Sequence, residues 1–209
     1  ISYLLFTIFK FWWADVAFAK GNGLNKDGEY ASAFPFFQKA VKLNSVEPNY
    51  YDELAWGAAN LTVLAFEEKE SSLSANFANL AISSSNQALA ISPKHLNFWK
   101  TRARVYYKIS QIDPKYLQRA QETLLKASQL APTEAKISYN LGLVYLQLGQ
   151  TREAQQILEE TVIMKQNYQE ARYALALLYQ EEGEKQKAIE QLEYILKFIN
   201  PDDPEVKQK

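Results

Sequence analysis

Apolar residues recur along this chain at spacings of three and four, which predict amphipathic helices, and the pattern itself repeats. The clearest stretch is YNLGLVYLQLGQTREA, residues 139–154. Its apolar and small positions are Leu141, Gly142, Tyr145, Gly149 and Ala154, followed by Leu158. Thirty-four residues later the same classes return as Leu175, Ala176, Tyr179, Gly183, Ala188 and Leu192. The pattern therefore predicts two consecutive helical hairpins of the same design.

Three weaker copies of this frame precede the two clear ones. We expect hairpins over residues 14–47, 48–95, 96–134, 135–168 and 169–202. The second expected copy holds 48 residues and the third 39, against a period of 34. Apolar positions continue into the longer second copy at Leu61, Leu64, Leu73, Phe77 and Leu80. We therefore expect both helices of the second hairpin to be longer by about two turns each.

Small residues indicate where the two helices of a hairpin cross. We expect Gly142 and Ala154 at the crossing, because small side chains let two helix backbones approach closely. Gly149 lies between them, and its backbone freedom is expected to end the first helix. Leu141 and Leu158 recur at helical spacing and are expected to fill the core around the contact.

A helix–turn–helix unit of 34 residues resembles the tetratricopeptide repeat (TPR). The family pattern runs from a bulky residue through Leu-Gly, Tyr, Ala and Phe to a closing Pro, and it covers nearly the whole chain. The resemblance implies an all-α fold, a right-handed α-solenoid of about five such hairpins preceded by an apolar N-terminal helix. It also implies a protein-interaction scaffold that binds a peptide, a protein or an anionic ligand in its concave groove.

In this family the first helices of the hairpins line the groove, and the corresponding residues can be located here. They are Asn97, Lys100, Arg104, Tyr107 and Lys108 in the third repeat, Lys136 and Tyr139 in the fourth, and Tyr173 in the fifth. Lys100, Arg104 and Lys108 are spaced by four and share one helix face. They could hold an acidic peptide, a phosphate or a phosphorylated glycan. The alternative is a solvated basic face that balances acidic neighbours.

One ligand of this family, the C-terminal carboxylate bound by its chaperone co-factors, is disfavoured. Those arrays use Lys and Asn on the first repeat, Asn on the second, and Lys and Arg on the third. Repeats one to three offer Phe18, Asn22, Glu53, Asn97 and Thr101 at these positions. Repeats three to five offer Lys100, Arg104, Asn140, Glu170 and Ala174. Neither set completes the clamp.

The first stretch, ISYLLFTIFKFWW, is mostly apolar but too short to span a bilayer, which takes about 20 apolar residues. An apolar run that ends in Lys10, Trp12 and Trp13 is typical of the last turns of a membrane helix. We therefore expect residues 1–13 to be the end of a membrane helix, with the array in water and a polar tail over residues 203–209. The alternative is an apolar helix that docks onto the first repeat.

A second resemblance covers residues 11–56. Ala14-Asp15, the Tyr-x-x-Ala at Tyr30 and the Glu-Pro-x-Tyr-Tyr-x-Glu at residues 47–53 resemble the segment after the last membrane helix of bacterial O-antigen polymerase or ligase-like proteins. In that family the membrane part handles lipid-linked glycans and holds the catalytic residues, and none of these maps onto this chain. The alternatives are a free-standing or singly anchored TPR adaptor without a link to glycan assembly, and an enzyme in its own right.

Composition argues against most chemistry. The formal net charge of −1 gives no general attraction to nucleic acid. The absence of cysteine excludes disulfides, thiolate metal sites and cysteine nucleophiles. The single histidine, His95, lies in a connector beside Pro93, so it is expected to be solvated or capping rather than catalytic. We therefore expect no catalytic residues, no metal site and no cofactor in this chain.

Overall fold

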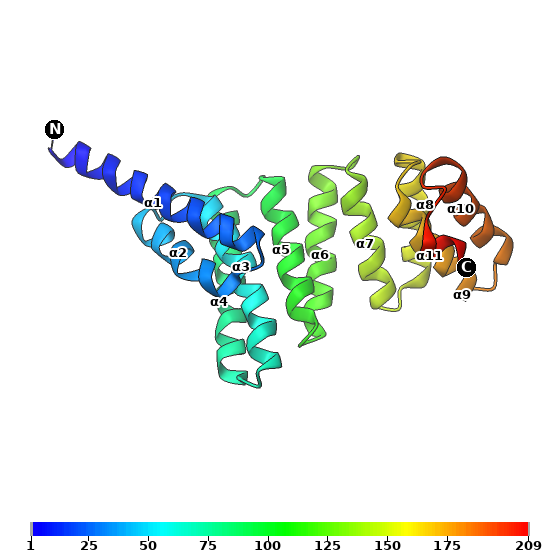
Figure 1. The fold of residues 1–209 in the computed structure, drawn as a ribbon, viewed down its shortest axis with the longest axis horizontal. Helices are drawn as coiled ribbons and strands as arrows, with labels where there is room; N and C mark the ends of the chain where they lie inside the picture. Colours follow the sequence, from blue (N-terminus) through cyan, green and yellow to red (C-terminus); the bar gives the residue numbers. More distant parts are fainter. Residues whose placement is uncertain (1, 209) are drawn as a thin grey trace. The chain divides into compact units, whose positions relative to one another are not determined.

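The computed structural model describes residues 2–208, with the side chains of residues 5–204 and 206–208. All regular secondary structure in this range is α-helical and arranged in paired hairpins, so the predicted all-α solenoid fold is confirmed (Figure 1). The chain divides into two compact units, Ile1–Thr123 and Leu124–Lys209. The boundary between them falls within helix α6 (Lys115–Leu130).

Unit 1 contains two hairpins followed by α5. Helix α1 (Ser2–Lys26) packs against α2 (Tyr30–Leu43), and α3 (Pro48–Glu67) packs against α4 (Ser71–Ile91). Helix α2 also packs against α3, which stacks the two hairpins, and α5 (Leu96–Ser110) packs against both α3 and α4. Each amphipathic hairpin leaves an apolar face uncovered, and the next hairpin in the stack buries it.

The second hairpin is lengthened as predicted. Helix α3 has 20 residues and α4 has 21, whereas α9 has 13 and α10 has 14. Seven added residues per helix correspond to about two turns. Figure 1 shows the turn of this hairpin projecting past the end of α2. Its apolar side chains Leu64, Phe66 and Leu73 are exposed there.

The apolar N-terminal stretch and the first helix of the first hairpin are one continuous helix, α1. Ala14 and Ala17 are buried with Ala40 and Tyr50 in the hairpin core. The large apolar side chains that precede Ala14 are exposed: Leu5, Phe6, Ile8, Phe9, Phe11, Trp12 and Trp13. Figure 1 shows this part of α1 extending away from α2. No helix in the described part of the chain combines the length and the apolarity needed to cross a membrane.

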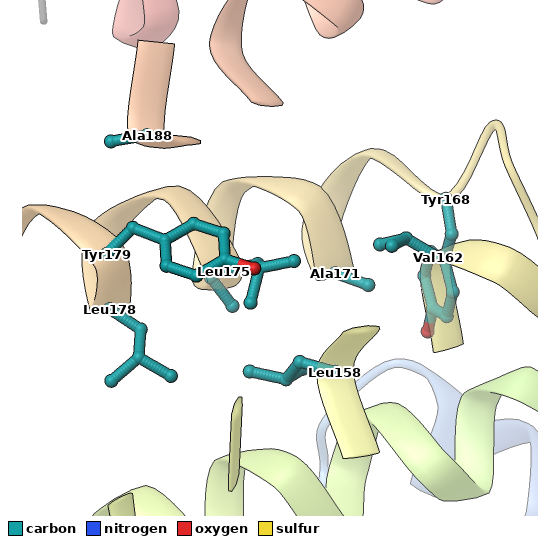
Figure 2. Packing of buried hydrophobic residues seen from close by; sticks show 9 residues of the cluster. Leu158, Val162, Tyr168, Ala171, Leu175, Leu178, Tyr179 and Ala188 are labelled. Atoms are coloured by element: carbon teal, nitrogen blue, oxygen red, sulfur yellow. The ribbon is translucent and has the colours of Figure 1, made fainter. Parts of the chain in front are cut away.

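Unit 2 contains two shorter hairpins. Helix α7 (Ala135–Gln147) packs against α8 (Thr151–Met164), α9 (Gln169–Glu181) packs against α10 (Lys185–Phe198), and α8 packs against α9. Figure 2 shows the core between these hairpins, where Leu158 of α8 points toward Ala171 and Leu175 of α9. Leu158 is fully buried and Leu175 is almost fully buried. The apolar residues that recur along the sequence thus pack together between α8 and α9, in a contact that we call the apolar seam of unit 2.

The predicted crossing of α7 and α8 is confirmed by the space around Gly142. A Cβ atom at Gly142 would lie 2.8 Å from Cγ of Leu158 and 3.2 Å from Cγ2 of Ile157. Ala154 is fully buried on the facing helix. The helix backbones therefore approach too closely for a larger side chain at Gly142 without a shift of its neighbours.

The hairpin turns show why glycine recurs between the helices. Gly28, Gly149 and Gly183 have φ values of 81°, 71° and 80°, a left-handed conformation that glycine adopts without a steric penalty. The corresponding turn between α3 and α4 places Lys69 at φ 65°. A residue with a Cβ atom is strained in this conformation. The turn of the long hairpin is therefore built less favourably than the other three.

The C-terminal segment expected as a polar tail contains a short helix, α11 (Pro204–Lys207). Oδ1 of Asp203 accepts a hydrogen bond from the backbone N–H of Val206 at 2.9 Å, and Oδ2 accepts one from Nε2 of Gln169 at 2.6 Å. Val206 is 4 % exposed. These contacts fix the segment on α9 within unit 2.

Candidate functional site

The predicted basic residues of the third repeat lie along α5. Arg104 is exposed, whereas Lys100 and Lys108 are half-buried. The Arg104 guanidinium carbon lies 3.8 Å from the ring centre of Trp56 on α3, which is a close cation–π contact. The same helix carries Asn97, which is exposed, and Tyr107, which is half-buried. An aromatic ring from the preceding hairpin thus positions the central cation of this face.

The remaining predicted groove residues lie in unit 2. Lys136 on α7 is exposed, and Tyr139 on α7 and Tyr173 on α9 are half-buried. The Tyr139 ring lies 5.1 Å from the ring of Tyr168, at the start of α9. The structure brings the α5 residues together on one helix and places Tyr139 in an aromatic pair of its own unit. Their combined role in one groove stays a prediction.

A second polar feature of unit 1 lies between the first helices α1 and α3. It is an open recess of about 350 Å³, which we call the acidic recess. Its lining residues are Asp15, Phe18, Glu47, Asn49, Tyr50, Asp52 and Glu53. Four of these seven side chains are carboxylates, and no Lys or Arg is among them. The recess therefore concentrates negative charge on the helices that line the predicted groove.

Each carboxylate of the acidic recess has a neutral hydrogen-bond donor. The Tyr50 hydroxyl donates to Oδ1 of Asp15, and Nδ2 of Asn49 donates to Oε1 of Glu47 at 2.6 Å. The Thr101 hydroxyl on α5 donates to Oδ2 of Asp52 at 2.8 Å, and Nδ2 of Asn25 donates to Oε2 of Glu53 at 2.8 Å. Within the described residues, these four carboxylates form no salt bridge.

Asp52 is the most deeply placed of the four carboxylates. Its residue is 9 % exposed, and its Oδ1 atom is buried without a hydrogen-bond partner. Burial, and to a smaller extent the neighbouring charge of Glu53, raise the pKa of Asp52 to about 7, against the opposing effects of the Thr101 hydrogen bond and of Arg104. Burial and the Asp15 carboxylate also raise the pKa of Tyr50. The recess therefore holds a carboxyl group that changes charge near neutral pH.

Sequence reasoning found only part of this recess. The family's repeat frame, applied to the second hairpin, assigns Asn49 and Asp52 to groove-facing positions, but it cannot show that Asp15 and Glu47 join them. The available signal was the pair of segments Ala14-Asp15 and 47–53, which carry all four carboxylates in two short runs. Those runs are separated by more than thirty residues, and only the stacking of α1 against α3 brings them together.

No metal-binding arrangement accompanies these features in the described part of the chain. No three Asp, Glu or His side chains there are grouped so as to hold a metal ion. His95 precedes α5, and its ring stacks on Phe98 at 4.1 Å between ring centres. It is therefore engaged in packing beside the connector.

Comparison with known proteins agrees with this architecture. Residues 139–204 match the tetratricopeptide repeat family. This part of the chain carries tetratricopeptide repeats. Repeats of this kind are typically non-catalytic and bind peptides or proteins.

Three known proteins illustrate the range that this chain resembles. It is 24 % identical over 164 residues to the human Protein O-mannosyl-transferase TMTC3, a match that covers 78 % of this chain and 17 % of that protein. The structure of TTC0263, a TPR protein of Thermus thermophilus, is 23 % identical, with a TM-score of 0.62 over 93 % of this chain and 95 % of that one. YrrB, described as a TPR protein with an unusual peptide-binding site, is 19 % identical, with a TM-score of 0.61 over 92 % of this chain and 89 % of that one.

These matches bear on the fold more than on the activity. At identities below a quarter, the two solved structures share the fold alone with this chain. The chain spans about a sixth of the length of the mannosyl-transferase that it matches. The activity of that larger protein therefore lies outside what the match describes.

Proposed function

We propose that this chain binds a peptide or protein segment along the first helices of its hairpins, and that α1, α3 and α5 form the principal contact surface. The observation that carries the proposal is the acidic recess beside the Arg104–Trp56 pair. Both features lie on the first helices of successive hairpins in unit 1. Polar and charged side chains of this kind give orientation and specificity to a peptide site. The peptide-binding site described for YrrB, which has the same fold, is consistent with this role.

A random peptide library displayed on phage tests the proposal. We expect the purified chain to enrich peptides, and we expect a selected peptide to slow hydrogen exchange in α3 and α5 rather than in the second helices α2 and α4. The absence of any enriched peptide, or protection confined to the second helices, would overturn it.

We further propose that the basic face of α5 contacts an anionic group, either an acidic peptide or a phosphorylated glycan. Arg104 is exposed and held by Trp56, and Lys100 and Lys108 share its helix face. The variant Lys100→Glu with Arg104→Glu should bind an anionic peptide from the library at least about tenfold more weakly, a loss of about 1.4 kcal/mol. Unchanged affinity in a folded double variant would remove the basic face from the proposal.

We also propose that the array is the water-exposed part of a membrane protein that assembles glycans, related to O-antigen polymerases or ligases. Two observations support this. The first is the exposed apolar and aromatic run over residues 5–13 of α1, with Lys10 within it. The second is the similarity to a short part of a much longer O-mannosyl-transferase. The competing function is a free-standing or singly anchored adaptor without a link to glycans.

The coding sequence upstream of Ile1 separates these two functions. Several upstream apolar stretches of about 20 residues each would favour the membrane glycan protein. A start codon close to Ile1, with at most one such stretch, would favour the adaptor.

Membrane contact itself can be tested with the chain in hand. We expect it to float with phosphatidylcholine vesicles, and we expect the variant Phe9→Asp with Trp12→Asp to lose this binding. The matched control is Leu64→Asp with Phe66→Asp, which places the same charges on the exposed apolar end of α3. Equal flotation of all three proteins would argue against a membrane role for α1.

A further inference from the structure

The acidic recess holds more negative charge than its surroundings neutralise. Asp15, Glu47, Asp52 and Glu53 line one space of about 350 Å³, and their hydrogen-bond donors are an amide, a hydroxyl or a phenol. Arg104 is the cation that acts on the pKa of Asp52, and its effect is the smallest of the four that set this pKa. Carboxylates gathered without a cation repel one another, and a bound cation would relieve that repulsion.

Asp52 gives an independent reason to expect a cationic ligand. It lines the recess, it is about nine-tenths buried, and its Oδ1 atom has no hydrogen-bond partner. A buried acceptor without a donor costs about 1–3 kcal/mol, because the folded chain does not replace the hydrogen bonds of water. A ligand that brings its own N–H donors would recover part of this cost. Such an unsatisfied group in an otherwise well-packed hairpin therefore points to a donor that arrives with a partner.

The walls of the recess add aromatic surface to the negative charge. Phe18, which is half-buried, and Tyr50, which is almost fully buried, both line it, and their ring centres lie 4.9 Å apart. An aromatic face attracts an ammonium or guanidinium group and also covers the alkyl stem of a long basic side chain. The recess volume lies at the lower end of the range for ligand pockets, about 300–1,000 Å³. Its size and lining suit a single long side chain better than an extended ligand.

We infer that the acidic recess binds a lysine or arginine side chain of the peptide or protein partner. Asp15, Glu47, Asp52 and Glu53 supply the counter-charge, and the half-buried Phe18 ring contacts the stem. The inference rests on the proposed function and deepens it, since it names the chemistry of one anchor residue. A partner with a basic residue near an acidic group would satisfy both the recess and the basic face of α5.

The test uses blocked heptapeptides of Ala, Gly and Ser with Arg, Lys, norleucine or Glu at the centre. Each peptide is titrated into the ¹⁵N-labelled chain and followed by NMR. We expect the Arg and Lys peptides to shift the backbone amide signals of residues 15–18 and 47–53. We also expect them to bind at least about tenfold more tightly than the norleucine peptide, which corresponds to about 1.4 kcal/mol. The Glu peptide should leave these signals unchanged.

Two double variants with the same change in net charge locate the effect. Asp15→Asn with Glu53→Gln removes two carboxylates from the recess and should abolish the tenfold preference. Glu67→Gln with Glu68→Gln removes two carboxylates at the far end of α3 and should retain it. Circular dichroism shows whether each variant remains folded. If a variant does not fold, the comparison of the Arg peptide with the norleucine peptide in the wild-type chain still tests the inference.

Several outcomes would overturn the inference. They are equal binding of the Arg and norleucine peptides, no shift with the Arg peptide, shifts confined to other helices, or an equal loss in both double variants. Shifts of the same amides by submillimolar CaCl₂ alone would reassign the recess to a metal ion. Peptides selected from the random library that bind the first helices without a basic residue in the recess would leave the proposed function standing. If the library yields no peptide at all, the proposed function itself fails.

Discussion

The contact between hairpins is apolar in unit 2, whereas the first helices of unit 1 bury two polar side chains that each have an unsatisfied oxygen. Leu158, Ala171 and Leu175 pack between α8 and α9 with at most 1 % exposure. In unit 1, Asn25 and Asp52 are 7 % and 9 % exposed, and each has an oxygen without a hydrogen-bond partner. These are the two buried unsatisfied side-chain atoms among the described residues.

This difference indicates that the same repeat serves two purposes, stabilising the stack of hairpins in unit 2 and offering a binding surface in unit 1. A seam of leucine and alanine stabilises stacking and offers little to a ligand. Buried carboxylates and amides oppose folding unless they are paired, so their presence on the first helices of unit 1 indicates a role outside stability. The long α3–α4 hairpin adds buried surface to the same unit, and its strained turn at Lys69 removes some of that gain.

The largest effect should come from the apolar seam. Leu158→Ala is expected to destabilise the chain by about 2–5 kcal/mol, because the fully buried side chain leaves a cavity between α8 and α9. Leu64→Ala, at the exposed end of the long hairpin, should change stability by less than about 0.5 kcal/mol. Urea unfolding measured by circular dichroism gives both values. Equal losses in the two variants would mean that the seam of unit 2 is no better packed than the hairpin end of unit 1.

The next effect concerns Asp52 and depends on pH. Its folded pKa of about 7 lies above the ordinary aspartate value of 3.8, so the folded chain holds the proton more tightly than the unfolded chain. The resulting stabilisation is fully present below about pH 4 and is lost as the pH rises through about 7. Asp52→Asn removes this loss, so it should stabilise the chain at pH 8 by up to about 4 kcal/mol, given about 1.4 kcal/mol per pKa unit.

Urea unfolding of wild type and Asp52→Asn at about pH 4.5 and about pH 8, on either side of the folded pKa, measures this difference. The gain from the substitution should be small at the lower pH and large at the higher one. Glu53→Gln is a useful comparison, because that half-buried neighbour raises the Asp52 pKa through its charge. It should give a smaller gain of the same sign. A gain from Asp52→Asn that does not depend on pH would show that the buried charge is not its cause.

Local sequence patterns predicted the fold well because its determinants are local. The spacing from Leu141 to Leu158 predicted the hairpin, and Gly142 and Gly149 predicted its crossing and its turn. The continuation of apolar residues past Leu61 predicted the long second hairpin. Each of these features depends on residues within about one repeat, where helical periodicity and glycine conformation decide the structure.

The site could be predicted only in part because it depends on contacts between hairpins. The repeat frame placed Arg104 on the first helix of the third hairpin, but its contact with Trp56 requires α3 and α5 to be stacked. The recess likewise joins Asp15 with Asp52 across two hairpins. The lateral register between hairpins is set by tertiary packing, and no short sequence pattern encodes it.

A smaller effect is expected from a glycine-to-alanine substitution, which can be made in both units. Gly142→Ala adds a Cβ atom 2.8 Å from the buried Leu158 side chain, so it should cost about 1–3 kcal/mol through overpacking. Gly23→Ala in α1 adds a Cβ atom with nothing within 4 Å, so it should stabilise the chain by about 0.5–1 kcal/mol through helix propensity. Thermal unfolding of both variants gives the sign directly. If both substitutions stabilise the chain, the close approach of α7 and α8 at Gly142 does not limit the size of the side chain there.

The smallest effect concerns the turns. Lys69 adopts a left-handed conformation in the long hairpin, where Gly149 occupies the equivalent turn of unit 2. Lys69→Gly should therefore stabilise the chain by up to about 1 kcal/mol, because the strain of a left-handed residue outweighs the greater entropy of glycine in the unfolded chain. Gly149→Lys should destabilise it by a similar amount. The two substitutions exchange glycine and lysine between the left-handed turn positions of the two units. Urea unfolding should therefore show changes in the free energy of unfolding that have opposite signs. A loss of stability in Lys69→Gly would mean that contacts of the lysine stem, rather than backbone strain, set the energy of the long hairpin's turn.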